Sequence, residues 1–247
     1  MTALAALTER VMLGTLRDLD LLFALLVPVA TFVGFTLALR GLIDTGGMDY
    51  PQYVLPAVVV QAMLLGALTT ADRAAREQST GLGVRLRTLP ISPAVPLVAR
   101  MLYCLVRGVI AVLAAIAIAY VFGFRMSGGF GYAVAFFVVS LTLTLALSLG
   151  ADAIGTWVKS TDVSSQLLLI PQLLLVLLST GMAPADSFPD WIQPFVLYQP
   201  VSQVTETLRG FTDGHVGAVN LLTSLAWCFG LLVIFGTIAL RMQRRTE

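Results

Sequence analysis

Charged residues are scarce in this chain. Only 12% of its 247 residues are Asp, Glu, Lys or Arg, whereas 57% are hydrophobic. Soluble domains carry about a quarter charged residues, and one core cannot hide so large an apolar excess from water. A soluble protein is therefore excluded, and a polytopic all-α membrane protein is expected. The net charge of +1 also gives no indication of the basic surface that nucleic-acid binding requires.

Reactive and metal-binding side chains are few as well. His215 is the only histidine and Lys159 the only lysine, and the cysteines Cys104 and Cys228 stand in apolar runs as expected for small core residues. The sequence has no Gly-x-x-x-x-Gly-Lys-Ser/Thr loop, no Gly-x-Ser-x-Gly elbow and no His-Glu-x-x-His pair. We therefore expect no catalytic residue, no metal and no cofactor on this chain, and no ATP hydrolysis by it.

Six apolar segments are expected to span the membrane as helices, at residues 19–39, 53–71, 97–122, 130–149, 164–182 and 217–240. Each approaches or exceeds the roughly 20 residues that cross ~30 Å of hydrocarbon. No Asp or Glu stands at the middle of a span, which argues against a proton- or sodium-coupled carrier. Residues 2–20 are weakly amphipathic and predict an interfacial helix rather than a secretory signal. Residues 1–247 thus form one transmembrane domain.

Basic residues predict the orientation of these spans. Twelve of the fifteen Lys and Arg residues fall on the side that holds both termini, and only Arg40, Arg125 and Arg209 fall on the other. Because positive charge is retained on the cytoplasmic side, both termini are expected in the cytoplasm.

Polar groups inside the spans have two interpretations each. Gln61 lies in span two, and Gln172 follows Pro171 in span five. They predict either hydrogen bonds between helices or a substrate path between spans two and five. A small polar stripe on span four (Ser140, Thr144, Ser148 and Asp152) predicts either close helix packing or the lining of a polar pathway.

The stretch from residue 75 to 96, between spans two and three, is the one long basic amphipathic segment. Leu82, Leu86 and Leu89 recur at i, i+4 and i+7, which gives a short helix one apolar face before Pro90 ends it. Such a helix either docks into a partner or lies on the membrane, held by anionic lipid. We expect docking.

The segment from residue 183 to 216 is too apolar for a solvated loop and too rich in proline to span. We expect two re-entrant or interfacial helices at the outer mouth, with a helical stripe of Val201, Val204, Leu208 and Phe211 in the second. If Pro189 begins the first of them, an aromatic face results, and Pro194 disturbs or ends that helix. We predict an outer gate there, formed by Pro184, Phe188, Pro189, Trp191 and Phe195; a static aromatic anchor is the alternative.

Two stretches resemble the membrane subunits of type 2 ABC exporters, especially daunorubicin-resistance-type permeases of actinobacteria. The first is Arg-Glu-Gln-Ser-Thr-Gly-Leu-Gly-Val-Arg-Leu-Arg-Thr-Leu-Pro-Ile at residues 76–91. The second begins with Gly-Met-Ala-Pro at residues 181–184 and continues with Phe-Pro-Asp-Trp-Ile-Gln-Pro-Phe at 188–195 and Gln-Pro-Val-Ser at 199–202.

This resemblance implies a function and partners. The chain would be a permease subunit that moves a drug or a cell-envelope lipid outward, paired with an identical or related permease and surrounded by membrane lipid. Two copies of an ATPase subunit would bind ATP and Mg and push on the amphipathic helix within residues 75–96, which would be the coupling helix. The coupling residues implied are Arg76, Glu77, Gly81, Leu82, Arg85, Leu86, Leu89 and Pro90. The alternatives are a small carrier or channel that needs no ATPase, and a membrane-embedded lipid-modifying enzyme.

Overall fold

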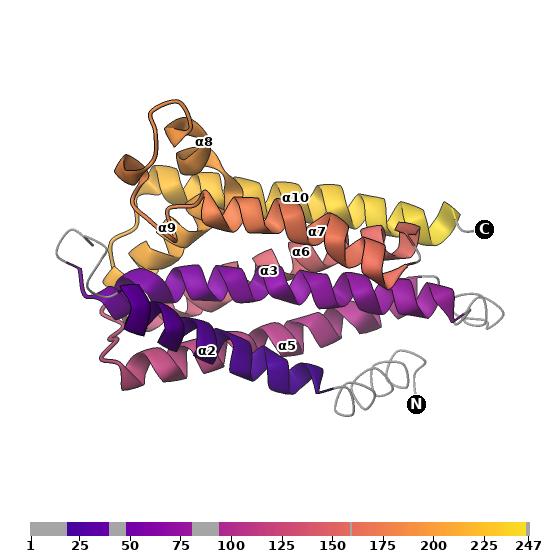
Figure 1. Cartoon of the computed structure of the whole chain (residues 1–247), viewed down its shortest axis with the longest axis horizontal. Helices are drawn as coiled ribbons and strands as arrows, with labels where there is room; N and C mark the ends of the chain where they lie inside the picture. Colours follow the sequence, from indigo (N-terminus) through magenta and orange to yellow (C-terminus); the bar gives the residue numbers. More distant parts are fainter. Residues whose placement is uncertain (1–18, 40–47, 81–93, 159, 246–247) are drawn as a thin grey trace.

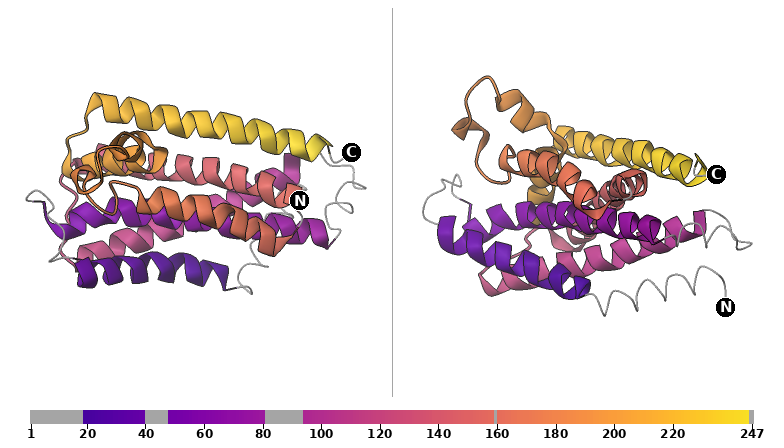
Figure 2. Two further views of the ribbon diagram at one scale, coloured as in Figure 1. Left: turned by 45° about the horizontal axis from the view of Figure 1, so that its top comes forward. Right: turned by 45° about the vertical axis from the view of Figure 1, so that its right-hand side comes forward.

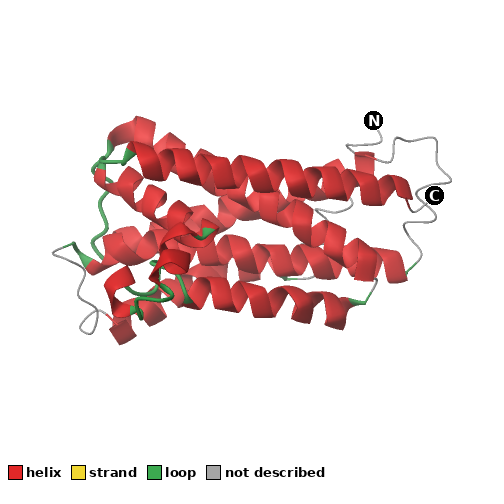
Figure 3. Cartoon of the chain, turned by 90° about the horizontal axis from the view of Figure 1, so that it is seen from above, coloured by secondary structure: helices red, strands yellow, loops and turns green. Residues whose placement is uncertain are grey.

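The computed structural model describes residues 19–39, 48–158 except 81–93, and 160–245, and in these ranges every regular element is helical (Figure 3). The helices are α2 (Asp20–Leu39), α3 (Tyr50–Ser79), α5 (Ala94–Val121), α6 (Gly129–Val158), α7 (Thr161–Leu177), the 3-10 turn η1 (Ala185–Ser187), α8 (Gln193–Tyr198), α9 (Pro200–Asp213) and α10 (Ala218–Arg245). The predicted all-α class is confirmed. The expected interfacial helix at residues 2–20 lies almost wholly outside the described residues.

Helices α2, α3, α5, α6, α7 and α10 run along the long axis of the molecule, whereas α8 and α9 lie together at one end (Figures 1 and 2). We call this the α9 end. The opposite end, where α3 finishes and α5 begins, carries Arg73 and Arg100, with Arg107 farther along α5, and is called the arginine end. Within the described ranges, α2, α3, α5, α6 and α10 are long and apolar enough to cross a membrane. The apolar helix α7, with 17 residues, is shorter.

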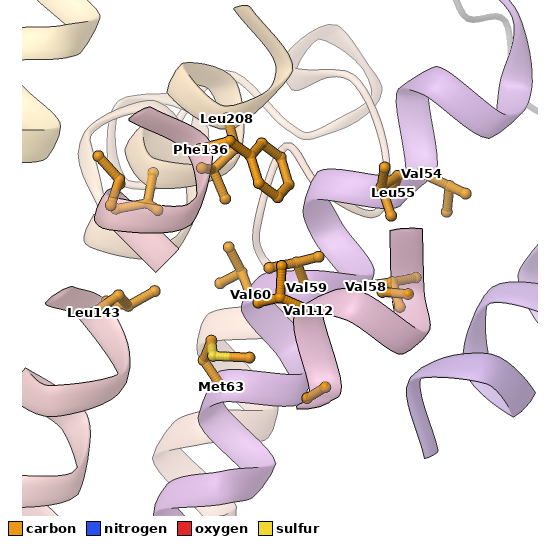
Figure 4. Packing of buried hydrophobic residues seen from close by; sticks show 14 of the residues in the cluster. Val54, Leu55, Val58, Val59, Val60, Met63, Val112, Phe136, Leu143 and Leu208 are labelled. Atoms are coloured by element: carbon orange, nitrogen blue, oxygen red, sulfur yellow. The ribbon is translucent and has the colours of Figure 1, made fainter. Parts of the chain in front are cut away.

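Helix α3 lies at the centre of the bundle and contacts α2, α5, α6, α7 and α9. Its valine-rich first half packs against residues of α5, α6 and α9, including Val112, Phe136 and Leu208 (Figure 4). Farther along, α3 and α6 approach so closely that a Cβ atom on Gly155 would lie 2.2 Å from the carbonyl oxygen of Ala71. Only glycine allows that contact. The two helices are therefore held in one register.

The helices do not all end where the predicted spans end. α3 continues eight residues past 71, and α6 continues nine residues past 149, through a region predicted as a loop. Four charged residues in these extensions, Asp72, Arg73, Glu77 and Asp152, contact partners on other helices, described below, so they do not end the helices. Helix α7 stops at Leu177, five residues before the predicted end of span five, and a turn follows.

The segment between α7 and α10 differs in part from its prediction. Val201, Val204, Leu208 and Phe211 are all buried on α9, so the predicted helical stripe is confirmed. The predicted helix from Pro189 is wrong: residues 189–192 form a turn, and α8 begins at Gln193 with Pro194 in its first turn. Proline fits the first turn because its missing N–H has no helical partner there.

Candidate functional site

Arg100 joins three helices at the arginine end. Its Nε and Nη2 atoms donate to the two carboxylate oxygens of Asp152 on α6 at 2.6 and 3.1 Å. Its Nη1 atom donates to Glu77 on α3 at 2.7 Å. The planar guanidinium can engage one carboxylate with two parallel bonds and a second carboxylate with its remaining edge. We call Glu77, Arg100 and Asp152 the arginine clamp.

Burial makes the arginine clamp sensitive to the loss of any member. The side chains of Arg100 and Asp152 are only 7% and 1% exposed, and that of Glu77 is 21% exposed. Removing one partner of a buried pair leaves an unpaired charge and costs about 3–5 kcal/mol. The clamp also joins the two helices that flank residues 81–93. Glu77 lies in the last turn of α3, before these residues, and Arg100 lies near the start of α5, after them.

A second charged group connects α2 to the same end. Asp20, the first residue of α2, lies 3.5 Å from both Arg73 and Arg107 and accepts a 2.6 Å hydrogen bond from the Tyr103 hydroxyl. Arg107 also donates to Thr69 at 2.7 Å. Arg107 thus reaches partners on both α2 and α3.

Helix α7 is attached through Asp72, whose carboxylate accepts hydrogen bonds from Ser164 and Ser165. A groove of about 290 Å³ opens beside these groups and is lined by Asp20, Thr69, Asp72, Arg73 and Arg76. Helices α2, α3, α5, α6 and α7 are thus tied together by polar contacts at the end from which the 81–93 connection departs.

The predicted coupling residues divide into two groups. Arg76 is exposed in the last turn of α3, and Glu77 belongs to the arginine clamp. The others lie outside the described residues: Gly81, Leu82, Arg85, Leu86, Leu89 and Pro90.

The three residues predicted for the substrate path lie on facing helices. Gln172 of α7 is 8% exposed and, with its amide oriented to satisfy both atoms, donates to the Leu64 carbonyl at 3.2 Å and accepts from the Leu65 N–H at 3.1 Å. Gln61 on α3 is half-buried, and Pro171 is exposed. Gln172 therefore makes the contact between helices that one of the two interpretations requires.

The polar stripe on α6 lies at buried helix contacts, and part of it lines a small cavity. Ser140 and Thr144 are buried at the contact with α3 and α5, where Gly108 leaves room for Thr144. Thr144 and Ser148 also line a small cavity of about 40 Å³, together with Cys104 and Arg107. Such a volume holds only a few water molecules.

The predicted gate residues lie around η1 and α8 at the α9 end. Trp191 is 81% exposed and Phe195 50% exposed, whereas Phe188 and Pro184 are half-buried and Pro189 is exposed. Aromatic side chains this exposed in a single chain leave apolar surface for lipid or a second subunit.

Sequence reasoning missed the arginine clamp. It placed every acidic residue at a span end or in a loop, yet Asp152 is fully buried within α6. The spacing of Arg100 and Arg107 on one helix face was visible in the sequence, but their partners, Asp152 and Asp20, are 52 and 87 positions away. Within the described residues, no three His, Cys, Asp or Glu side chains come together as metal ligands.

Comparison with known proteins agrees with this architecture. The sequence profile of the ABC-2 type transporter family matches residues 2–211. The chain belongs to the ABC-2 type transporter family. Its apolar helices are accordingly those of a multi-pass membrane permease.

Several relatives of this ABC-2 type chain are drug-resistance permeases. A probable doxorubicin resistance ABC transporter permease protein of Mycobacterium tuberculosis, DrrC, is 29% identical over 92% of this chain and 83% of its own length. Another from that organism, the doxorubicin resistance ABC transporter permease protein DrrB, is 30% identical over 74% of this chain and 65% of its own length. A daunorubicin resistance ABC transporter permease protein of Streptomyces coeruleorubidus is 25% identical over 91% and 80%.

Proposed function

We propose that this chain is a permease subunit of an ATP-driven exporter that moves a hydrophobic or amphipathic molecule, a drug or a cell-envelope lipid, outward across a bacterial plasma membrane. The family and the names of its relatives support the general class. The observation that supports the mechanism is the arginine clamp, which joins the helices on either side of the 81–93 connection. The connection is the surface on which an ATPase subunit would act.

The proposed mechanism is a mechanical one. Two ATPase subunits that bind ATP and Mg press on residues 81–93 of two permease subunits, identical or related. Because Glu77 and Arg100 join the ends of that connection and Asp152 joins them to α6, the push moves α3, α5 and α6 as one body. Asp20 and Asp72 extend the motion to α2 and α7.

The orientation and the partner surface complete this proposal. Of the arginines in the described ranges, only Arg125 and Arg209 lie toward the α9 end and the others lie toward the arginine end, which supports a cytoplasmic location for that end and for both termini. The most apolar stretches of α2 and α10 are only 22% and 11% buried, and the exposed face of α7 includes Ile170 and Leu173. These faces are available to lipid and to the second permease subunit.

The aromatic residues at the α9 end have a proposed role as an external gate. Phe188, Trp191 and Phe195 would close the exit by apolar packing against the partner subunit. The exposure of Trp191 and Phe195 in the single chain supports this assignment. Burial of 150–250 Å² of a Trp side chain at ~25 cal/mol per Å² sets an upper scale of roughly 4–6 kcal/mol for such closure.

The deciding experiment is purification of the tagged chain from its native membrane in mild detergent, followed by transport in proteoliposomes. We expect a phosphate-loop ATPase to co-purify and transport to require ATP hydrolysis.

A self-sufficient carrier is the competing function, and the buried Asp152 is the observation in its favour, since intramembrane carboxylates often carry ions. Its pairing with Arg100 opposes that role. Transport by the purified chain alone, without ATPase, would refute the exporter proposal.

A further inference from the structure

The groove of about 290 Å³ at the arginine end carries two opposite charges that are not paired with each other. Asp72 and Arg76 both line it. They are one helical turn apart on α3, a spacing at which a carboxylate and a guanidinium are neighbours and attract each other. Within the described residues, however, neither of them belongs to an ion pair. The groove therefore exposes a negative and a positive group side by side.

The carboxylate of Asp72 is bound by helix α7 instead of by Arg76. Ser164 and Ser165 both donate hydrogen bonds to its Oδ1 atom. These hydroxyl groups orient the carboxylate but bring no positive charge to it. Its other oxygen, Oδ2, accepts no hydrogen bond within the described residues and is not buried, so it can be reached from the groove. Asp72 thus offers an accessible negative charge to a cationic donor.

The guanidinium of Arg76 is the positive counterpart. Arg76 is exposed in the last turn of α3, and its side chain has no hydrogen-bond partner within the described residues. Asp20, the other carboxylate that lines the groove, does not compensate it, because Asp20 already lies 3.5 Å from both Arg73 and Arg107. Arg76 is therefore available to an anionic group.

Apolar surface continues from this groove toward the middle of the bundle. Helix α3 lies between α2 and α7 and contacts both (Figures 1 and 2). Phe23 follows Asp20 by one turn on α2 and is 56% exposed, and Leu169 follows Ser165 by one turn on α7 and is 44% exposed. Apolar tails can lie against these side chains while a charged head group occupies the groove. This combination fits a membrane lipid rather than a soluble ion.

We propose that the groove binds the head group of a zwitterionic aminophospholipid, phosphatidylethanolamine. Its phosphate accepts hydrogen bonds from the guanidinium of Arg76, a group well suited to phosphate. Its ammonium, joined to the phosphate by a short ethylene linker, donates to Oδ2 of Asp72. Phosphatidylcholine lacks the N–H donors, and phosphatidylglycerol lacks the positive charge. This lipid site goes beyond the proposed exporter function and does not depend on it.

The test is native mass spectrometry of the full chain, delipidated in mild detergent and titrated with phosphatidylethanolamine, phosphatidylglycerol or phosphatidylcholine of identical acyl chains. The ethanolamine lipid should bind more tightly than the other two. Asp72→Asn keeps an acceptor for the two serines but removes the charge. It should weaken binding of the ethanolamine lipid roughly tenfold and leave binding of the glycerol lipid unchanged. Asp72→Glu keeps the charge and should retain the preference.

Arg76→Gln tests the phosphate contact. It should weaken the ethanolamine and glycerol lipids alike, because both contain the phosphate, and it should leave the melting temperature unchanged, because Arg76 is exposed. Arg125→Gln is the matched control, since Arg125 is an exposed arginine that does not line the groove. It should leave lipid binding unchanged. The lipids are compared on the same protein, so partial unfolding of a variant lowers binding of all of them and leaves the preference unaltered.

Three results would overturn the lipid site. Equal binding of the three lipids by the wild type would show that the groove does not recognise the head group. An unchanged preference in Asp72→Asn would remove the carboxylate from the site. Arg76 is also a predicted coupling residue, so an ATPase surface is the competing occupant, and displacement of the bound lipid by a co-purified ATPase would assign the groove to that partner. The first two results leave the exporter proposal standing, because they do not depend on whether ATP drives transport.

Discussion

Replacing Arg100 with methionine tests the arginine clamp directly. The change leaves the Asp152 carboxylate, 1% exposed, without a counter-charge, whereas Glu77 at 21% exposure can regain some water. We expect a loss of about 3–5 kcal/mol in the free energy of unfolding. At about 2–4 °C per kcal/mol for a chain of this size, the melting temperature should fall by roughly 6–20 °C.

The two cysteines supply the assay. Cys104 and Cys228 are both buried, so a thiol-reactive fluorophore labels them only as the protein unfolds in detergent. Arg125→Met is the matched control, because Arg125 is exposed and its guanidinium donates to the backbone carbonyl oxygens of Tyr120 and Phe124, which are near it in the chain. It should shift the melting temperature little.

The double variant Arg100→Met, Asp152→Leu decides the cause of the loss. Removing both charges and filling the space with apolar atoms should recover most of the stability, because the penalty lies in the unpaired carboxylate. A double variant less stable than Arg100→Met alone would refute the reasoning. An Arg100→Met protein with the same melting temperature as the wild type would also refute it.

Three further predictions address the proposed function. Leu82→Asp combined with Leu86→Asp should abolish co-purification of the ATPase, since a charge in a dry apolar contact costs several kcal/mol; full association and full transport would contradict docking there. Gln172→Leu should lower stability by about 0.6–2 kcal/mol, and unchanged export per folded complex would remove it from the substrate path. Cysteines placed at Phe188 and Phe195 should react with an external water-soluble reagent at different rates with and without a trapped ATP state. Equal rapid labelling would show a static anchor.

Hydropathy predicted the long helices because burial in lipid is a local property of composition. Helix α9 was predicted for a similar reason, since its 3.6-residue stripe is local to the segment. The short α7 illustrates the limit of this signal: its apolar run continues past the helix end, where the residues enter a turn packed against α9.

Pairings between distant residues were not available from one sequence. Charges at positions 72–77 and at 152 resemble span ends, and only the contacts with Ser165, Arg100 and their neighbours show why the helices continue. The polar contacts at the α9 end have the same origin, because Tyr53, Thr180 and Arg209 meet from positions up to 156 residues apart. Local patterns predicted the helices, whereas the sites depend on how the helices pack.

The placement of the charges has a consequence for biosynthesis. With the arginine end in the cytoplasm, as proposed, Asp20, Glu77, Arg100 and Asp152 stand on the side from which the nascent chain enters the bilayer, and none of them has to cross the hydrocarbon. Arg209 does have to cross. It travels with Glu206 three residues before it on the same helix, so the two can cross as a neutral pair that already has its final 2.6 Å contact.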